Sequence, residues 1–218
     1  MKHAILIGLA AASALAGGCA NVGRSRDIGN PDISATTLAQ QVCSNCHGLK
    51  GSTVSPNFPN LAGQTEPYIV AQLNAFKSHG RRDPAGFEYM WGLSRSLTEQ
   101  QIAGLGAYFS AQVPARQPVQ GDPGRFGTGK EIFEKGIAAA SVPPCSSCHG
   151  AEGKGNGMFP RIAGQHADYI VKQLIVFQRT EERTEERPQG AIMKNVAHEL
   201  SPKNIDDVAA YLQALPDL

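Results

Sequence analysis

Aromatic residues and net charge are both scarce in this sequence. Only 6% of its 218 residues are aromatic, one of them a tryptophan, and the formal net charge is +1. A nearly neutral chain gives no indication of nucleic-acid binding, which is marked by an excess of basic residues. Hydrophobic residues make up 41%, enough to bury a core in one large domain or two small ones. With so few large rings, that core needs some other group to fill its centre.

The N-terminal apolar run is too short to cross a bilayer comfortably. It reads AILIGLAAASALA at residues 4–16 and follows the positive Lys2, whereas a membrane-spanning helix needs about 20 residues. A charged start followed by an apolar run of this length is typical of a signal peptide. We expect residues 1–18 to be that signal rather than a buried N-terminal helix, and the mature protein to work outside the cytoplasm.

Five cysteines are present, and one of them, Cys19, follows directly after the apolar run. An odd cysteine in an exported protein requires an explanation. The small residues before it resemble a bacterial lipobox, in which the chain is cleaved before the cysteine and the cysteine is then acylated. Leu15 lies one position further away than is usual. Several acyl chains would hold the protein stably on a membrane. We therefore expect lipidation of Cys19 and a polar tether at 19–34; the alternative is an ordinary signal peptide cut nearby, such as after Ala20.

The chain repeats itself at an interval of about a hundred residues. Residues 59–76 and 160–177 share 10 of 18 positions, and LTEQQIAGLGAYF parallels LSPKNIDDVAAYL further on. Matches in the same order indicate a tandem duplication of one domain. A segment rich in Pro, Gly and Gln separates the copies and is typical of a linker. The expected domains are 35–112 and 129–218, joined by a linker at 113–128.

Each copy has the apolar spacing of α-helices, and neither has a convincing strand. The middle helix of each repeat shows the period of one buried helix face. Its apolar positions are Tyr68, Ile69, Leu73 and Phe76, and in the second copy Tyr169, Ile170, Leu174 and Phe177. At the start of the last helix, Thr98 and Gln101 fit a capping box, and Ser201 precedes a proline at the first helical position. The expected fold class is all-α.

The other four cysteines lie in two copies of one motif, CSNCHG at 43–48 and CSSCHG at 145–150. A gap of two residues brings both thiols onto one side of a single turn, and the histidine follows on the same side. In a c-type haem site both thiols add to the haem vinyl groups and the histidine binds the iron. We expect two covalently bound haem c groups. The residues that hold them are Cys43, Cys46 and His47 in the first copy and Cys145, Cys148 and His149 in the second.

Two other kinds of site also use paired cysteines. Zinc sites can combine two CxxC pairs, but usually across a short spacer, whereas these pairs lie about a hundred residues apart, each in its own repeat. A thioredoxin-like redox motif belongs to a βαβ pattern, which is not visible here. Covalent haem is therefore the interpretation that the sequence favours.

Two methionines occupy matching places in the two repeats. Met90 lies 43 residues after His47, and Met193 lies 44 residues after His149. A thioether on the far side of a haem iron raises its reduction potential and closes the site to small ligands. We therefore expect Met90 and Met193 to be the second axial ligands. Met158 has no methionine opposite it in the repeat and is expected to serve packing only.

The remaining histidines lack counterparts in the repeat. We expect His79, His166 and His198 at the surface or in ordinary hydrogen bonds, with His198 the one alternative ligand because it lies close to the second expected methionine. A haem-binding histidine usually donates its other ring N–H to a carbonyl, which fixes the ring. Pro59 and Pro160 follow the motif histidines by twelve and eleven residues, and we expect their carbonyls to accept these bonds.

Together these features resemble the dihaem cytochrome c4 family: two CxxCHG motifs, a Leu/Ile-Ala-Gly-Gln segment, a late methionine and a capped helix ending in Ala-Tyr. The resemblance covers about residues 35–215. It implies two tandem class I cytochrome c domains, each wrapped around one covalent haem and related by a pseudo-twofold axis. The expected ligand residues fall on the family's axial positions. Two features depart from the family, namely the expected lipid anchor and the bulky run GRRDPAGFEYMWG around Met90.

The resemblance implies an electron carrier and not an enzyme. Members carry single electrons in an extracytoplasmic respiratory chain, from a quinol-oxidising complex or dehydrogenase to a terminal oxidase or reductase. The expected location is the periplasm, with the protein held on a membrane through Cys19. One alternative is the cytochrome subunit of a periplasmic dehydrogenase complex. Another is a dihaem peroxidase, which needs one haem that can open and is disfavoured by the paired methionines.

Overall fold

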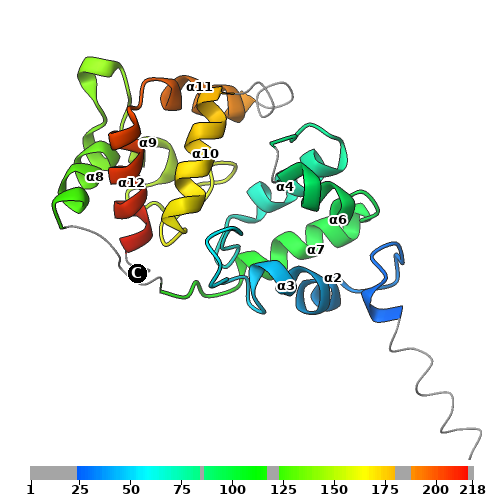
Figure 1. The fold of residues 1–218 in the computed structure, drawn as a ribbon. Coiled ribbons are helices and arrows are strands. Elements are labelled where there is room, and N and C mark those ends of the chain that lie inside the picture. Colours follow the sequence, from blue (N-terminus) through cyan, green and yellow to red (C-terminus); the bar gives the residue numbers. More distant parts are fainter. Residues whose placement is uncertain (1–23, 84–85, 117–122, 180–187, 216–218) are drawn as a thin grey trace, which may run out of the picture.

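A computed structural model of the chain describes residues 24–83, 86–116, 123–179 and 188–215. The expected signal peptide and Cys19 lie outside these residues. Within them the chain forms helices and no β-strand; the extended pairing is limited to two isolated bridges, Ile137 with Val142 and Asn156 with Phe159. The expected all-α class is confirmed. Figure 1 shows two bundles of helices side by side, the first running from blue to green and the second from green to red.

The first bundle begins with a continuous helical stretch made of three pieces. These are α2 (Ala35–Leu38), the π-helical turn η2 (Ala39–Cys43) and α3 (Ser44–His47), after the short 3-10 turn η1 (Arg24–Arg26). The long helices α4 (Glu66–Lys77) and α7 (Glu99–Ser110) complete the bundle, with η3 (Phe87–Trp91) and α6 (Gly92–Ser94) between them. The capping box of Thr98 and Gln101 is present at the start of α7, as expected.

The second bundle repeats this plan. It consists of α8 (Pro123–Lys135), η4 (Ala138–Ala140), α9 (Ser146–His149), α10 (Ala167–Arg179), α11 (Pro188–His198) and α12 (Pro202–Ala214). Ser201 caps α12 and Pro202 occupies its first turn, as expected. Helix α8 begins at Pro123, within the segment expected as a linker. A proline at the first helical position costs no hydrogen bond, so the composition typical of a linker is compatible with this helix.

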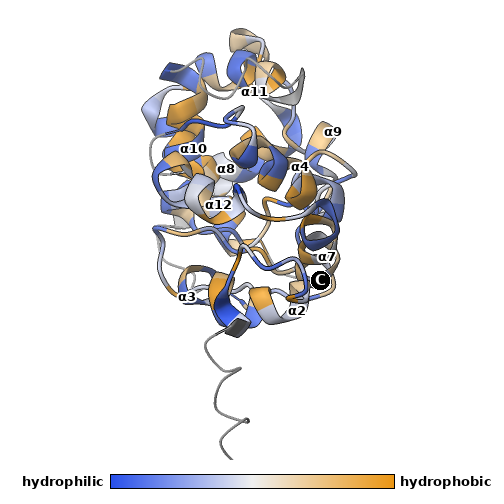
Figure 2. Cartoon of the chain, turned by 90° about the vertical axis from the view of Figure 1, so that its right-hand side faces the viewer, coloured by the Kyte–Doolittle hydropathy of each residue, from blue (hydrophilic) through white to orange (hydrophobic). Residues whose placement is uncertain are grey.

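Each bundle has its own hydrophobic core. Leu38 on α2 packs with Ile102, Leu105 and Phe109 on α7 in the first bundle, and Phe133 on α8 packs with the inner face of α12 in the second. Burying one such side chain contributes about 1.5–3 kcal/mol. The helices are amphipathic, and Figure 2 shows hydrophobic and hydrophilic residues on the same helices. In the described residues no helix has both the length and the hydropathy to cross a membrane.

Candidate functional site

The two CxxCH motifs have the same backbone in both bundles. Each histidine ends a short helix, and the glycine that follows has a positive φ, +77° at Gly48 and +83° at Gly150. A Cβ added at Gly48 would lie 2.2 Å from the carbonyl oxygen of Ser52. Only glycine adopts this conformation without strain, so the glycine after each histidine is required for the chain to turn away. In the first bundle the π-helical turn η2 ends at the first motif cysteine, Cys43, and such turns recur at functional sites.

Both motif histidines are buried and fixed by a proline carbonyl. His47 Nδ1 lies 2.9 Å from the Pro59 oxygen, and His149 Nδ1 lies 2.8 Å from the Pro160 oxygen. The expected acceptors are therefore confirmed. Because a carbonyl only accepts, Nδ1 carries the proton and Nε2 keeps the lone pair that a metal needs. A phenylalanine edge packs on each ring, Phe58 on the first and Phe159 on the second.

The ionisation of the motif side chains suits a neutral donor set. Burial lowers the pKa of His47 and of His149, and the bond to the proline carbonyl opposes this shift. Burial also raises the pKa of Cys43 and of Cys145 to about 11. At neutral pH the imidazoles are therefore uncharged and these thiols protonated. The motif cysteines form no disulfides, which leaves their sulfurs available for thioether bonds.

One continuous cavity of about 630 Å³ brings the expected haem residues of both bundles together. Its volume lies in the range of cofactor sites, about 300–1,000 Å³. Most of the side chains that line it are apolar. The eight expected haem residues all line it: Cys43, Cys46, His47, Met90, Cys145, Cys148, His149 and Met193. This donor set, two thiols, one imidazole and one thioether per bundle, fits two haem c groups.

The second expected ligands come from segments other than the motifs. Met90 lies in η3, where Ser94 Oγ donates to its carbonyl oxygen at 2.7 Å, and Met193 lies on α11 against the second core. Both methionines are half-buried. Met158 also lines the cavity, a position that its expected packing role did not specify. The aromatic neighbour Trp91 stacks on Phe87 with ring centroids 5.9 Å apart.

The other histidines have the ordinary roles expected of them. His166 is buried, and its Nε2 donates to the Thr53 carbonyl of the first bundle at 2.9 Å. His79 is exposed beside the Trp91 ring. His198 is also exposed, and its Nδ1 lies 3.0 Å from Glu199 Oε1. Met193 lines the cavity, and His198 is not part of its wall. Among the described residues no three His, Cys, Asp or Glu side chains cluster as a metal site.

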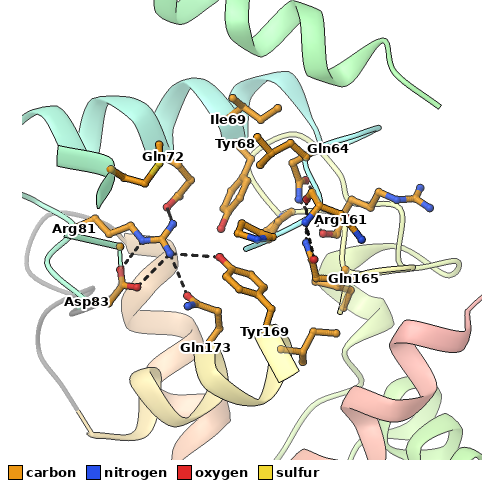
Figure 3. A pocket seen from close by; sticks show the side chains of 18 of the residues that line it. Gln64, Tyr68, Ile69, Gln72, Arg81, Asp83, Arg161, Gln165, Tyr169 and Gln173 are labelled. Carbon is orange, nitrogen blue, oxygen red and sulfur yellow. Dashed lines mark hydrogen bonds and ion pairs between the residues drawn. The ribbon is translucent and has the colours of Figure 1, made fainter. Parts of the chain in front are cut away.

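A cluster of polar side chains in the cavity wall between the bundles was not predicted from the sequence. The buried Arg81 pairs with Asp83, Nε to Oδ1 at 2.6 Å, and its other nitrogens reach Gln72 of the same bundle and Tyr169 and Gln173 of α10 (Figure 3). Burial is the largest single influence on the pKa of Arg81 and lowers it, but Asp83, Tyr169 and Tyr68 together outweigh burial and raise that pKa. Arg81 therefore remains a cation that contacts both bundles at the cavity.

Comparisons with known proteins agree with this geometry. The cytochrome c family model matches residues 34–111 and again 127–216. Cytochrome c-552 of Acidithiobacillus ferridurans is 37% identical over 192 residues, 88% of this chain and 81% of that protein. Cytochrome c4 of Azotobacter vinelandii is 36% identical over 191 residues, 84% of this chain and 89% of that protein. The chain belongs to the cytochrome c4 family.

A solved cytochrome c4 has the same fold as this chain. The crystal structure of reduced recombinant cytochrome c4 from Pseudomonas stutzeri matches it with a TM-score of 0.74 and 32% identity, covering 86% of this chain and 99% of that one. The two bundles are therefore tandem class I cytochrome c domains, as expected. As a member of the cytochrome c4 family, the chain binds two haem c groups covalently. A thiosulfate dehydrogenase electron acceptor of Stutzerimonas stutzeri is a more distant relative, 28% identical over 79% of this chain and 78% of that protein.

Proposed function

We propose that this cytochrome c4-family protein carries single electrons in an extracytoplasmic respiratory chain and is not itself an enzyme. The observation that carries the proposal is the shared cavity, into which each domain contributes two thiols, one imidazole and one thioether. When bound, each haem supplies an iron that accepts and returns one electron. Because the protein fills both axial positions, the site has no vacant position for a substrate, and electron transfer needs little rearrangement.

We assign the residues to roles by domain. In the first domain Cys43 and Cys46 hold the haem covalently while His47 and Met90 are the axial ligands. In the second domain the same roles belong to Cys145, Cys148, His149 and Met193. The proline carbonyls orient the imidazoles, since each accepts the Nδ1–H and turns Nε2 toward the cavity. We propose domain bounds of 35–112 and 129–218 with a linker at 113–128, the last part of which forms the start of α8 at Pro123.

The axial assignment can be tested with three methionine variants. Met90→Ala and Met193→Ala should each abolish about half of the methionine–iron charge-transfer absorbance and allow one haem per protein to bind carbon monoxide. Met158→Ala is the matched control, because Met158 lines the same cavity without an assigned bond. Loss of the band in Met158→Ala, or its full retention in either of the other variants, would contradict the assignment.

The donor is proposed to be a quinol-oxidising complex or a dehydrogenase, and the acceptor a terminal oxidase or reductase. A second candidate is the cytochrome subunit of a periplasmic dehydrogenase complex, which the relationship to a thiosulfate dehydrogenase electron acceptor favours. Size-exclusion chromatography of the native protein separates the two. A carrier elutes alone and is reduced by its donor in a concentration-dependent reaction, whereas a subunit elutes with its catalytic partner in a fixed ratio.

The proposed location is the periplasm, with residues 1–18 removed as a signal and the protein anchored on a membrane by acylated Cys19 through the tether at 19–34. The apolar run and the small residues before Cys19 support this. Cys19→Ser should move the holoprotein from the membrane fraction to the soluble fraction. Mass spectrometry of the mature N-terminus should show acyl chains in the wild type; an unmodified N-terminus after Ala20 would instead support the ordinary signal peptide.

A further inference from the structure

In each domain, the glutamine of the repeated Ala-Gly-Gln segment forms hydrogen bonds with the backbone of the other domain. Gln64 Oε1 accepts the backbone N–H of Arg161 at 2.6 Å, and Gln64 Nε2 donates to the Arg161 carbonyl at 2.9 Å. Gln165 does the same with Asn60, at 2.8 Å and 3.0 Å. Asn60 and Arg161 hold equivalent places in the two repeats, four residues before the glutamine of their own domain. The two glutamines therefore form a reciprocal pair across the interface. Figure 3 labels both of them, together with Arg161.

The orientation of each glutamine amide is determined by the donors around it. Two backbone N–H groups converge on each oxygen: Thr65 N–H joins Arg161 N–H at Gln64 Oε1, and His166 N–H joins Asn60 N–H at Gln165 Oε1. An N–H cannot donate to an amide nitrogen that is itself a donor, so the oxygens point at these groups. Both glutamines are buried, with 6% and 7% of their surface exposed, and water does not compete for these bonds.

Each glutamine binds the same peptide group that holds the opposite domain's histidine. The N–H of Asn60 belongs to the peptide whose carbonyl, that of Pro59, accepts the proton of His47 Nδ1. In the second domain the N–H of Arg161 belongs to the peptide whose carbonyl, that of Pro160, accepts from His149. Each motif histidine is therefore linked to a glutamine of the other domain through a single peptide group, whose carbonyl bonds the histidine and whose N–H bonds the glutamine.

We propose that these glutamines are positioning residues that tune the haem of the opposite domain: Gln165 acts through Pro59 on His47, and Gln64 acts through Pro160 on His149. This inference rests on the proposed axial role of the two histidines. An amide whose N–H is engaged has a more negative carbonyl oxygen, since hydrogen bonds in a chain polarise one another. A stronger acceptor gives the imidazole more anionic character, which favours ferric over ferrous iron. The glutamines thus lower the potential of the haem across the interface.

The size of the effect follows from the strength of the bonds. A peptide hydrogen bond in apolar surroundings is stronger than one in water, and a neighbouring bond strengthens it further by roughly 10–30%. Only the part of this strengthening that differs between the ferric and the ferrous state shifts the equilibrium. Removing a glutamine should therefore raise the ferrous-to-ferric ratio of the opposite haem by about twofold, and by at most about tenfold, at a fixed ambient potential. For a one-electron couple the upper end corresponds to about 59 mV.

The test measures the potential of each haem in holoprotein variants. Gln64→Leu should raise the potential of the second domain's haem, and Gln165→Leu that of the first. NMR during a redox titration resolves the two haems through their shifted methyl signals, which are assigned by their contacts with the backbone of each CxxCH motif. The Nδ1 proton of the affected histidine should shift in the same variant. Gln64→Met and Gln165→Met keep the side-chain length and provide the same test if a leucine variant does not fold.

Thr65→Val is the matched control. Thr65 Oγ1 donates to the Gly157 carbonyl of the other domain at 2.7 Å. Removing this hydroxyl weakens the interface, while the Thr65 backbone N–H still donates to Gln64 Oε1. Thr65→Val should leave both potentials unchanged. The proposal is overturned if a glutamine variant shifts its own domain's haem, shifts both equally, shifts neither, or does no more than Thr65→Val. Failure of the axial assignment would appear earlier and separately, as a wild-type protein whose haems are not low-spin.

Discussion

Asp83→Asn should destabilise the first domain far more than a substitution that breaks a surface ion pair. Arg81 and Asp83 are 8% and 2% exposed at their side chains, and the carboxylate lies 2.6 Å from the guanidinium. Asparagine keeps the volume of aspartate but not its charge, so the guanidinium remains a buried cation without a counter-charge. Breaking a buried pair in this way costs about 3–5 kcal/mol. The glutamine oxygens of Gln72 and Gln173 still accept from Arg81, so we expect the lower end, about 3 kcal/mol.

Guanidinium unfolding followed by tryptophan fluorescence measures this directly. The single tryptophan, Trp91, lies in the first domain, so its fluorescence reports on that domain alone, and separation from the haem on unfolding relieves its quenching. With a denaturant slope of about 3 kcal/mol per M for a small domain, the midpoint should fall by about 1 M. Glu99→Gln is the matched control, because it breaks the exposed pair with Lys77, in which Glu99 is 74% exposed. Such a pair contributes less than about 1 kcal/mol. Equal midpoints for Asp83→Asn and Glu99→Gln would refute the reasoning.

Three further predictions concern helix ends and haem attachment. Thr98→Ala should cost about 1 kcal/mol by removing the α7 capping box and should lower the Trp91 midpoint, whereas Ser201→Ala in the second domain should leave that midpoint unchanged. Gly48→Ala should reduce the yield of protein with two haems, measured as pyridine haemochrome, because φ is +77° and the Cβ would meet the Ser52 backbone; Gly92→Ala, where a Cβ meets nothing within 4 Å, should not. Cys46→Ala should keep its haem through one thioether and move half of the haemochrome band to longer wavelength, while a normal band would contradict the role of Cys46.

The features that could be predicted from the sequence are those that involve residues of a single repeat. The matching offsets of twelve and eleven residues from the motif histidines to Pro59 and Pro160 predicted both carbonyl acceptors. The Thr98 and Ser201 caps marked where the last helices begin. Local bonds of this kind depend on residues close together in the chain, so spacing alone is informative. The turn after each motif is equally local, because the glycine there adopts a backbone conformation that other residues avoid.

Contacts between the domains could not be predicted in this way. Gln64 and Gln165 recur at one repeat position, but nothing in a single repeat indicates that this position faces the other copy. The available signal for these contacts was that both copies have a glutamine at the same position of the repeat. Arg81 meets Gln173 across 92 residues of sequence, and only the packing of the two domains brings them together. The start of α8 was missed because proline and glycine favour a linker by composition, whereas packing against α12 stabilises a helix.

The most direct test of two closed haem sites is the optical spectrum of the purified holoprotein, oxidised and reduced, with and without carbon monoxide. Two low-spin c-type haems per chain, a methionine–iron charge-transfer band and no spectral change on adding carbon monoxide are the predicted result. A high-spin component, or one haem that binds carbon monoxide, would contradict the central claim. It would mean that Met90 or Met193 leaves the iron open, as a peroxidase requires.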